Sequence, residues 1–152
     1  MSPGFSETGG SRWTPTPAGV PVRITSPGSS VKTLDACATS HDGVDWGWHG
    51  TALAPRPGTW DARGARVTAV LADGRAAYDG RATKEENFFE RTGLARLVGN
   101  AGELEQTNND AAVDARYLDV LPLPGGGYRI WYEARLPDES HELRTELVVA
   151  QA

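Results

Sequence analysis

The chain has 152 residues and a formal net charge of −5; 39% of its residues are hydrophobic and 23% are charged. This length suits one domain with a core of its own. The acidic balance, with arginines scattered along the chain, argues against nucleic acid as a partner. No apolar stretch of about eighteen residues occurs, so we expect no membrane span and no membrane partner.

The chain has a single cysteine, Cys37, which excludes an intrachain disulfide and a zinc site built from cysteines. The three histidines, His41, His49 and His141, lie on different predicted elements and lack the spacing of metal ligands. We therefore expect no metal ion and no cofactor. The first residues do not form a charged and then apolar leader. Together with the lone thiol, this pattern leads us to expect a cytoplasmic protein.

The first predicted unit spans about residues 12–53. Its predicted strands are 12–16, 31–39 and 44–53. The last two are joined by residues 40–46, which read Ser-x-Asp-Gly-x-x-Trp, a tight Asp-Gly turn followed by an aromatic residue on a strand. This unit is therefore expected to be about one strand short of four.

The second unit spans about residues 65–107 and the third about 115–150. Four strands are predicted in the second unit, at 65–71, 75–79, 91–97 and 103–107. Three strands are predicted in the third unit, at 115–121, 128–135 and 142–150. Both units alternate short apolar segments with turns that are rich in Gly, Pro and Asp.

The two later units repeat one another. Arg66 and Arg116 occupy matching places 50 residues apart, and Arg91 and Arg144 are 53 residues apart. A period of about 50 residues that holds four short strands is that of a propeller blade. The sequence therefore predicts a single all-β domain over residues 1–152, a partial β-propeller of two to three four-stranded antiparallel blades.

Three short segments of these units resemble one known superfamily. They are Trp60-Asp61 before a strand, Tyr78-Asp79-Gly80-Arg81 at a strand end, and Thr92-Gly93-Leu94-Ala95 at a strand start. With the Ser-x-Asp-Gly-x-x-Trp turn, they make residues 35–150 similar to the C-terminal blades of the five-bladed β-propeller glycoside hydrolase superfamily. That superfamily includes arabinanases, fructosidases and mannoside phosphorylases. Its early blade, which usually supplies the general base, has no counterpart in this sequence.

Candidate catalytic residues lie on two loops that are expected to meet. In an antiparallel blade, the loop before the first strand and the loop after the second strand lie at the same end of the sheet. Sugar cleavage needs two carboxyl groups roughly 5–10 Å apart, and Asp61, Asp79 and Glu86 are the candidates on these loops. The alternative is structural, with Asp61 capping a strand, Asp79 beginning a turn and Glu86 in a solvated charge pair.

Six further side chains are candidates for substrate binding, namely Trp60, Arg81, Asn87, Arg66, Arg116 and His49. An indole such as Trp60 can stack on a sugar ring; the alternative is packing between blades. Arg66 and Arg116 either line an axial channel or pair with Asp61 and Asp114, and we favour the ion pairs.

Two classes of function fit these observations. The first is a carbohydrate-binding or remnant module derived from a glycoside hydrolase-type propeller, with an oligosaccharide or glycoside as the ligand. The alternative is an active glycosidase completed by self-association, so whether the chain is an enzyme stays open. Because blades cover one another's apolar faces and too few are present to close a ring, we also expect a homodimer.

Overall fold

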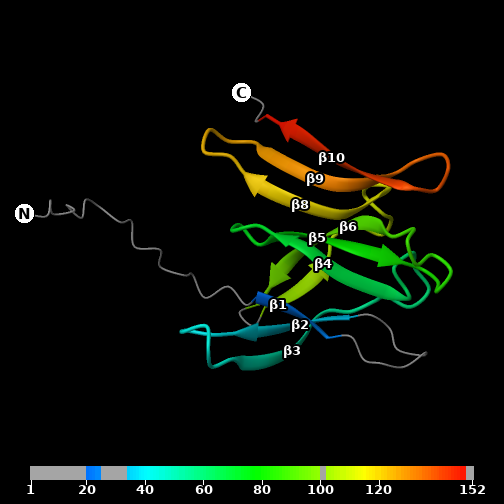
Figure 1. Ribbon diagram of the computed structural model, residues 1–152. Coiled ribbons are helices and arrows are strands. Elements are labelled where there is room, and N and C mark those ends of the chain that lie inside the picture. Colours follow the sequence, from blue (N-terminus) through cyan, green and yellow to red (C-terminus); the bar gives the residue numbers. More distant parts are fainter. Residues whose placement is uncertain (1–19, 25–33, 100–101, 150–152) are drawn as a thin grey trace, which may run out of the picture.

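The computed structural model describes residues 20–24, 34–99 and 102–149. These residues form ten β-strands in three antiparallel sheets (Figure 1). They include no helix that is long and apolar enough to cross a membrane. The predicted all-β class, built from blade-like antiparallel sheets, is confirmed. The strand predicted at 12–16 lies outside the described residues.

The first sheet contains, in this order, β1 (Val20–Ile24), β2 (Leu34–Thr39) and β3 (Gly47–Leu53). The sequence does not predict β1, because Pro21 interrupts its apolar run and proline is tolerated in a strand mainly at a sheet edge. The turn between β2 and β3 forms as expected. The Asp42 carboxylate accepts hydrogen bonds of 2.9 Å from the backbone N–H groups of Val44 and Asp45. These bonds lower the pKa of Asp42.

The central sheet contains, in this order, β4 (Gly64–Val70), β5 (Arg75–Arg81), β6 (Arg91–Val98) and β7 (Glu103–Gln106). The third sheet, in the order β10-β9-β8, contains β8 (Ala115–Pro122), β9 (Tyr128–Arg135) and β10 (His141–Val148). These seven strands lie within a few residues of their predicted ranges. Among the residues described, only the central sheet has four strands.

The register of the strands shows the internal repeat directly. Arg66 on β4 lies opposite Asp79 on β5, and Arg116 on β8 lies opposite Glu133 on β9. In both sheets a β-bulge interrupts the ladder shortly after the arginine. Bulges re-aim side chains locally, so the repeat includes the local backbone shape as well as the strand order.

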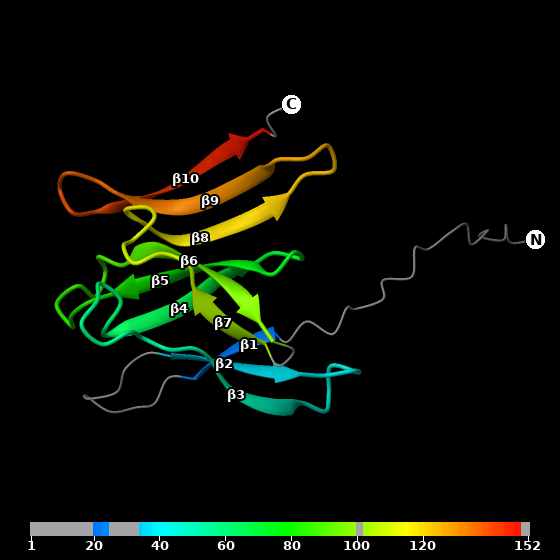
Figure 2. The same cartoon turned by 180° about the vertical axis from the view of Figure 1, so that it is seen from behind.

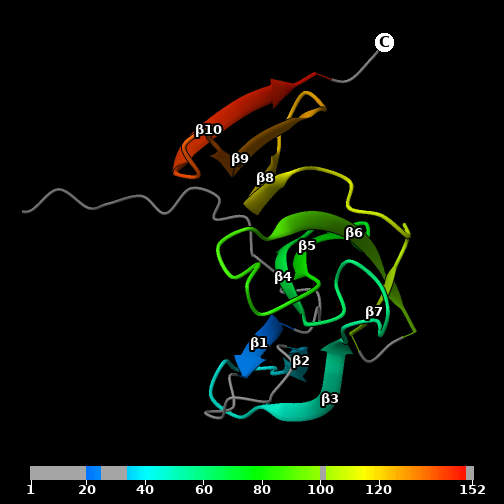
Figure 3. The same ribbon diagram turned by 90° about the vertical axis from the view of Figure 1, so that its right-hand side faces the viewer.

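The three sheets stack with the central sheet in the middle, as Figure 1 and Figure 2 show from opposite sides. β2 and β3 contact β4, while β8 contacts β4, β5 and β6; the view at right angles shows the same order (Figure 3). Most buried hydrophobic residues are alanines, which let the sheets approach closely. The largest fully buried side chain is Tyr78 of β5, which packs in one cluster with Leu53 of β3 and Leu104 of β7. The main core therefore lies between the first and central sheets.

Two buried aspartates connect each sheet to the next, and we call them the inter-sheet aspartates. Asp35 of β2 accepts a hydrogen bond from the backbone N–H of Val67 on β4. The two carboxylate oxygens of Asp79 on β5 lie 3.1 and 3.2 Å from the backbone N–H of Tyr117 on β8. Val67 and Tyr117 each follow the repeated arginine directly. Each of the first two sheets thus supplies a buried carboxylate to the first strand of its neighbour.

Candidate functional site

A closed polar cluster surrounds Asp61, in the loop between β3 and β4. The Asp61 side chain is fully buried, and its Oδ2 lies 3.0 Å from Nη2 of Arg56. The Tyr78 hydroxyl donates a hydrogen bond of 2.8 Å to the same oxygen, and the Thr59 hydroxyl donates to the other. Burial, with the hydrogen bond to Asp61, raises the pKa of Tyr78. We call these four residues the Asp61 cluster, in which both carboxylate oxygens have partners.

Trp60 packs beside the Asp61 cluster and against the core. Its ring stacks on that of Tyr78 with centroids 5.6 Å apart, and the Arg91 guanidinium lies 5.5 Å from its ring centroid. Gly80 permits this packing, because a Cβ at that position would lie 2.5 Å from the Trp60 ring. The structure therefore places this candidate for sugar stacking in a partly buried, structural position.

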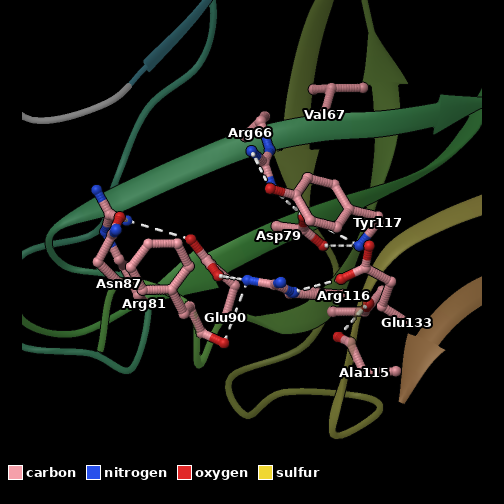
Figure 4. A network of polar contacts seen from close by, with 12 residues as sticks. Arg66, Val67, Asp79, Arg81, Asn87, Glu90, Ala115, Arg116, Tyr117 and Glu133 are labelled. Atoms are coloured by element: carbon pink, nitrogen blue, oxygen red, sulfur yellow. Dashed lines mark hydrogen bonds and ion pairs between the residues drawn. The ribbon is translucent and has the colours of Figure 1, made fainter. Parts of the chain in front are cut away.

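A pocket of about 190 Å³ opens on the other face of the central sheet, toward β8 (Figure 4). Its polar lining is Arg66, Asp79, Arg81, Asn87 and Glu90, and its aromatic lining is Phe88 and Tyr117. We call it the Asp79 pocket. It faces away from the Asp61 cluster because consecutive residues of a strand point to opposite faces: Tyr78 reaches the cluster and Asp79 reaches the pocket.

Asp79 is almost fully buried and is held from two sides. Arg66 forms an ion pair with it, and the backbone N–H of Tyr117 donates to it. Burial raises the pKa of Asp79, although the pair with Arg66 opposes this effect, and the nearby charge of Glu90 adds to it. Burial alone would lower the pKa of Arg66, but the hydrogen bond and charge of Asp79 outweigh burial and raise it.

A second series of ion pairs runs from the pocket to the third sheet. Oε1 of Glu90 lies 3.2 Å from Nη1 of Arg81, and Oε2 lies 3.3 Å from Nη1 of Arg116. Nε of Arg116 also lies 2.8 Å from Glu133, its cross-strand partner. Arg81 in addition donates to the side chain of Asn87. Charge-assisted bonds of this kind fix the orientation of planar guanidinium groups, so the polar lining is held in place before any ligand enters.

Two aromatic side chains with unusual backbone geometry complete the pocket. Tyr117 is 45% exposed and Phe88 is 63% exposed. The guanidinium carbons of Arg66 and Arg116 lie 4.3 and 4.9 Å from the centroid of the Tyr117 ring. Both aromatic residues have positive φ angles, 54° for Tyr117 and 87° for Phe88, which costs energy for residues other than glycine. Such strain gathers at functional sites, so these two rings are candidates for ligand contact.

The structure brings four of the predicted site residues into one pocket, namely Arg66, Asp79, Arg81 and Asn87. Arg116 lies beside it, bound to Glu90. Asp61 and Trp60 belong to the opposite face of the sheet. Consequently the two predicted catalytic aspartates do not line the same pocket.

Glu86 and His49 lie elsewhere. The Glu86 carboxylate accepts a hydrogen bond of 2.7 Å from the backbone N–H of Ala82, and Glu86 lines a separate, more open hollow of about 360 Å³ next to Arg91. His49 is exposed on β3, with Nε2 lying 2.6 Å from the hydroxyl of Thr39. Neither residue lines the Asp79 pocket.

Arg66 and Arg116 form ion pairs, but the predicted partners were wrong. Arg66 pairs with Asp79 instead of Asp61, and Arg116 pairs with Glu90 and Glu133. Asp114 pairs with Arg135, with 2.9 Å between Nη2 and Oδ2. The physical reason is proximity, because a residue directly opposite on the neighbouring strand is closer than one at the start of the same strand.

Sequence reasoning missed three residues of the pocket, Phe88, Glu90 and Tyr117. Tyr117 has a signal, since it follows the repeated Arg116 directly. Glu90 and Phe88 have none, because both belong to a polar loop whose path cannot be inferred from spacing. Within the three described ranges, no group of three or more His, Cys, Asp or Glu side chains is arranged to hold a metal ion.

Comparison with known proteins finds likeness at the level of the fold. No protein-family model and no curated protein matches the sequence. Two solved structures, one described as a glycoside hydrolase and the other as a complex of BT0996 and RGII, resemble the chain with TM-scores of 0.54 and identities of 17% and 18%. Each likeness covers 89% of this chain and 54% of the solved one, so the chain spans about half the length of those structures. The chain has a glycoside hydrolase-like fold.

Proposed function

We propose that the chain is a carbohydrate-binding module of the glycoside hydrolase-type propeller fold, and that the Asp79 pocket is its glycan site. The observation that carries the proposal is the meeting of pre-oriented polar groups with two exposed aromatic rings in one pocket. Small polar ligands are held by a few convergent polar groups over an apolar surface. Aromatic rings offer such a surface to the C–H faces of sugars.

The polar lining suits the recognition of hydroxyl groups. Asn87 provides both donors and acceptors, and the guanidinium groups of Arg66 and Arg81 are donors in fixed positions. The carboxylates of Asp79 and Glu90 accept hydrogen bonds. A sugar with several vicinal hydroxyl groups presents matching donors and acceptors. The fold shared with a structure described as a glycoside hydrolase supports this choice of ligand class.

Binding is favoured over hydrolysis by the state of the carboxylates. Hydrolysis needs one carboxyl group that is protonated near neutral pH and a second that is ionised and able to reach sugar or water. In the Asp79 pocket, Asp79 is paired with Arg66, and Glu90 is paired with Arg81 and Arg116. Two pocket carboxylates that are both tied to guanidinium groups orient a ligand more readily than they exchange protons with it.

A glycosidase remains the second candidate because of one observation. The pKa of Asp79 is raised by burial, and Glu90 lies in the same pocket, near enough for its charge to raise that pKa further. A raised carboxyl pKa is the property required of a general acid. Turnover of aryl glycosides by the purified chain, abolished in both Asp79→Asn and Glu90→Gln, would favour hydrolysis over simple binding.

The binding proposal is tested by titrating the protein with a panel of neutral and acidic oligosaccharides, followed by calorimetry. We expect at least one saturable ligand. Asn87→Ala and Tyr117→Ala should each weaken its affinity about tenfold, since a lost hydrogen bond or ring contact is worth about 1 kcal/mol. Trp48→Ala is the matched control, because Trp48 is an exposed aromatic on β3 outside the pocket.

Circular dichroism of each variant separates lost binding from lost folding. If no member of the panel binds, or if Trp48→Ala weakens binding as much as Tyr117→Ala does, the Asp79 pocket is not a glycan site. The remnant interpretation, a propeller fragment without a ligand, would then replace the proposal.

A further inference from the structure

Strand β10 leaves one of its edges open. It pairs with β9 over its whole length, from His141 opposite Arg135 to Val148 opposite Tyr128. It is the last strand of its sheet among the described residues, and it forms the outer end of the stack in Figure 1. In the central sheet, a fourth strand, β7, pairs at the corresponding place. A long strand with an open edge is a template for pairing with another strand.

The side chains of β10 are sorted by face. Successive residues of a strand point to opposite faces of the sheet. One face therefore presents Leu143, Thr145 and Leu147. The other presents Glu142, Arg144 and Glu146. Leu143 is 73% exposed and Leu147 is 53% exposed, so this strand offers an apolar face to solvent as well as an open edge.

We propose that β10 pairs with β10 of a second copy of this chain, antiparallel and about a two-fold axis at Thr145. In this register Arg144 lies opposite the partner's Glu146, and Leu143 lies opposite the partner's Leu147. Thr145 lies opposite the partner's Thr145. Two-fold symmetry forms the charge pair and the leucine pair twice each. Cross-strand pairs of opposite charge, of apolar side chains and of threonines all stabilise antiparallel strands.

The neighbouring registers are unfavourable, so the sequence of β10 selects this one. A slip of one residue places the apolar face of one strand beside the charged face of the other. A slip of two residues in one direction sets Arg144 opposite the partner's Arg144. A slip of two in the other direction sets Glu146 opposite the partner's Glu146. Like charges directly opposite one another destabilise a sheet.

The dimer joins two three-stranded sheets into one continuous sheet of six strands. The leucines of both copies then form one apolar strip across the junction. The Asp79 pocket is unaffected, because β4, β5, β8 and the loop before β6 line it and β10 does not. This inference therefore does not rest on the proposed function, and a dimer would present two such pockets.

The first test is the mass in solution, measured by analytical ultracentrifugation at micromolar concentration. We expect twice the 16.2 kDa of one chain. Arg144→Glu and Glu146→Arg should each raise the dimer dissociation constant about tenfold or more, because each change opposes two pairs of like charges. Arg96→Glu is the matched control, since Arg96 is equally exposed to solvent on β6 and lies away from β10.

The register is tested by rescue. The double variant R144E/E146R exchanges the two charges, so the dimer should return. Mixing the two single variants should produce a heterodimer, because every charge of one chain then meets an opposite charge on the other. A general loss of folding in the single variants would not be repaired by mixing, which keeps the test decisive.

A covalent readout uses the residue on the two-fold axis. Thr145→Cys places two thiols opposite one another, and an added mild oxidant should convert them to an intermolecular disulfide. Leu143→Cys should remain unlinked, because it lies opposite the partner's Leu147. Cys37 is 2% exposed and stays out of this reaction. A monomeric wild-type chain, a dimer that ignores both charge reversals, or equal cross-linking of both cysteine variants would overturn the proposal.

Discussion

Asp61 and Asp79 are two buried carboxylates on adjacent parts of one sheet, each paired with an arginine. Asp61 is enclosed by side chains of its own neighbourhood, and the hydroxyl of Tyr78 contacts it. Asp79 instead receives a peptide N–H from the third sheet and borders a pocket. Their different surroundings follow from the alternation of strand β5, because Tyr78 and Asp79 are consecutive and face opposite ways. One face of the sheet is closed for stability and the other remains open to a ligand.

The largest expected effect separates the two carboxylates by stability. Asp61→Ala leaves the Arg56 guanidinium and the Tyr78 hydroxyl without their partner in the interior, and removing one member of a buried ion pair costs about 3–5 kcal/mol. Urea unfolding should show a corresponding fall in the free energy of unfolding. Asp114→Ala is the matched control, because its pair with Arg135 is exposed and should contribute little. Similar losses in the two variants would contradict the assignment of Asp61 as a structural residue.

A smaller effect is expected from crowding the closed face. A Cβ at Gly93 would lie 2.4 Å from the ring of Tyr78, so Gly93→Ala forces the largest buried side chain to move. Overpacking of a core costs about 1–3 kcal/mol, and the urea midpoint should fall with the slope unchanged. At Gly125 an added Cβ meets nothing within 4 Å. Gly125→Ala should therefore leave the midpoint nearly unchanged; an equal fall would mean that loss of glycine itself causes the effect.

The smallest effect is a pH dependence on the open face. Burial raises the pKa of Asp79, so the folded protein holds a proton on this residue more tightly than the unfolded chain does. The stability contributed in this way is present below the ordinary pKa of about 3.9 and is lost as the pH rises through the raised pKa. The difference in unfolding free energy between wild type and Asp79→Asn should therefore decrease as the pH rises across that window.

The sign of this dependence has its own control on the surface. The pKa of Asp73 is lowered by its hydrogen bond to Arg75, so its stabilising contribution is lost as the pH falls. The difference between wild type and Asp73→Asn should accordingly change in the opposite direction. If the Asp79 difference also increases with pH, the ion pair with Arg66 outweighs burial at that site.

The sequence predicts the strands well because the repeat places each of them twice. Arg66 and Arg116, 50 residues apart, identify matching strands, and the structure gives both a cross-strand acidic partner. β1 escapes prediction because Pro21 is the kind of residue that normally argues against a strand.

The site is only half predictable, and the reason is which face of a strand a residue occupies. Asp61 and Asp79 are both expected at the same end of one blade, and the sequence alone does not reveal that β5 separates them. Glu90 and Phe88 lie in a loop, where neither periodicity nor spacing indicates direction. The positive φ angles of Phe88 and Tyr117 have no signature in the sequence, because such geometry is usually assigned to glycine.

The inter-sheet aspartates bear on how the protein is made. Asp35 contacts Val67, which is 32 residues later, and Asp79 contacts Tyr117, which is 38 residues later. Chains grow from the N-terminus and fold as they emerge, so each carboxylate is synthesised well before the peptide N–H that it accepts. The first sheet can bury Asp35 beneath the central sheet only after β4 has left the ribosome, and Asp79 in turn awaits β8. The growing chain therefore adds its sheets in a fixed sequence, in which each new first strand completes the sheet made before it.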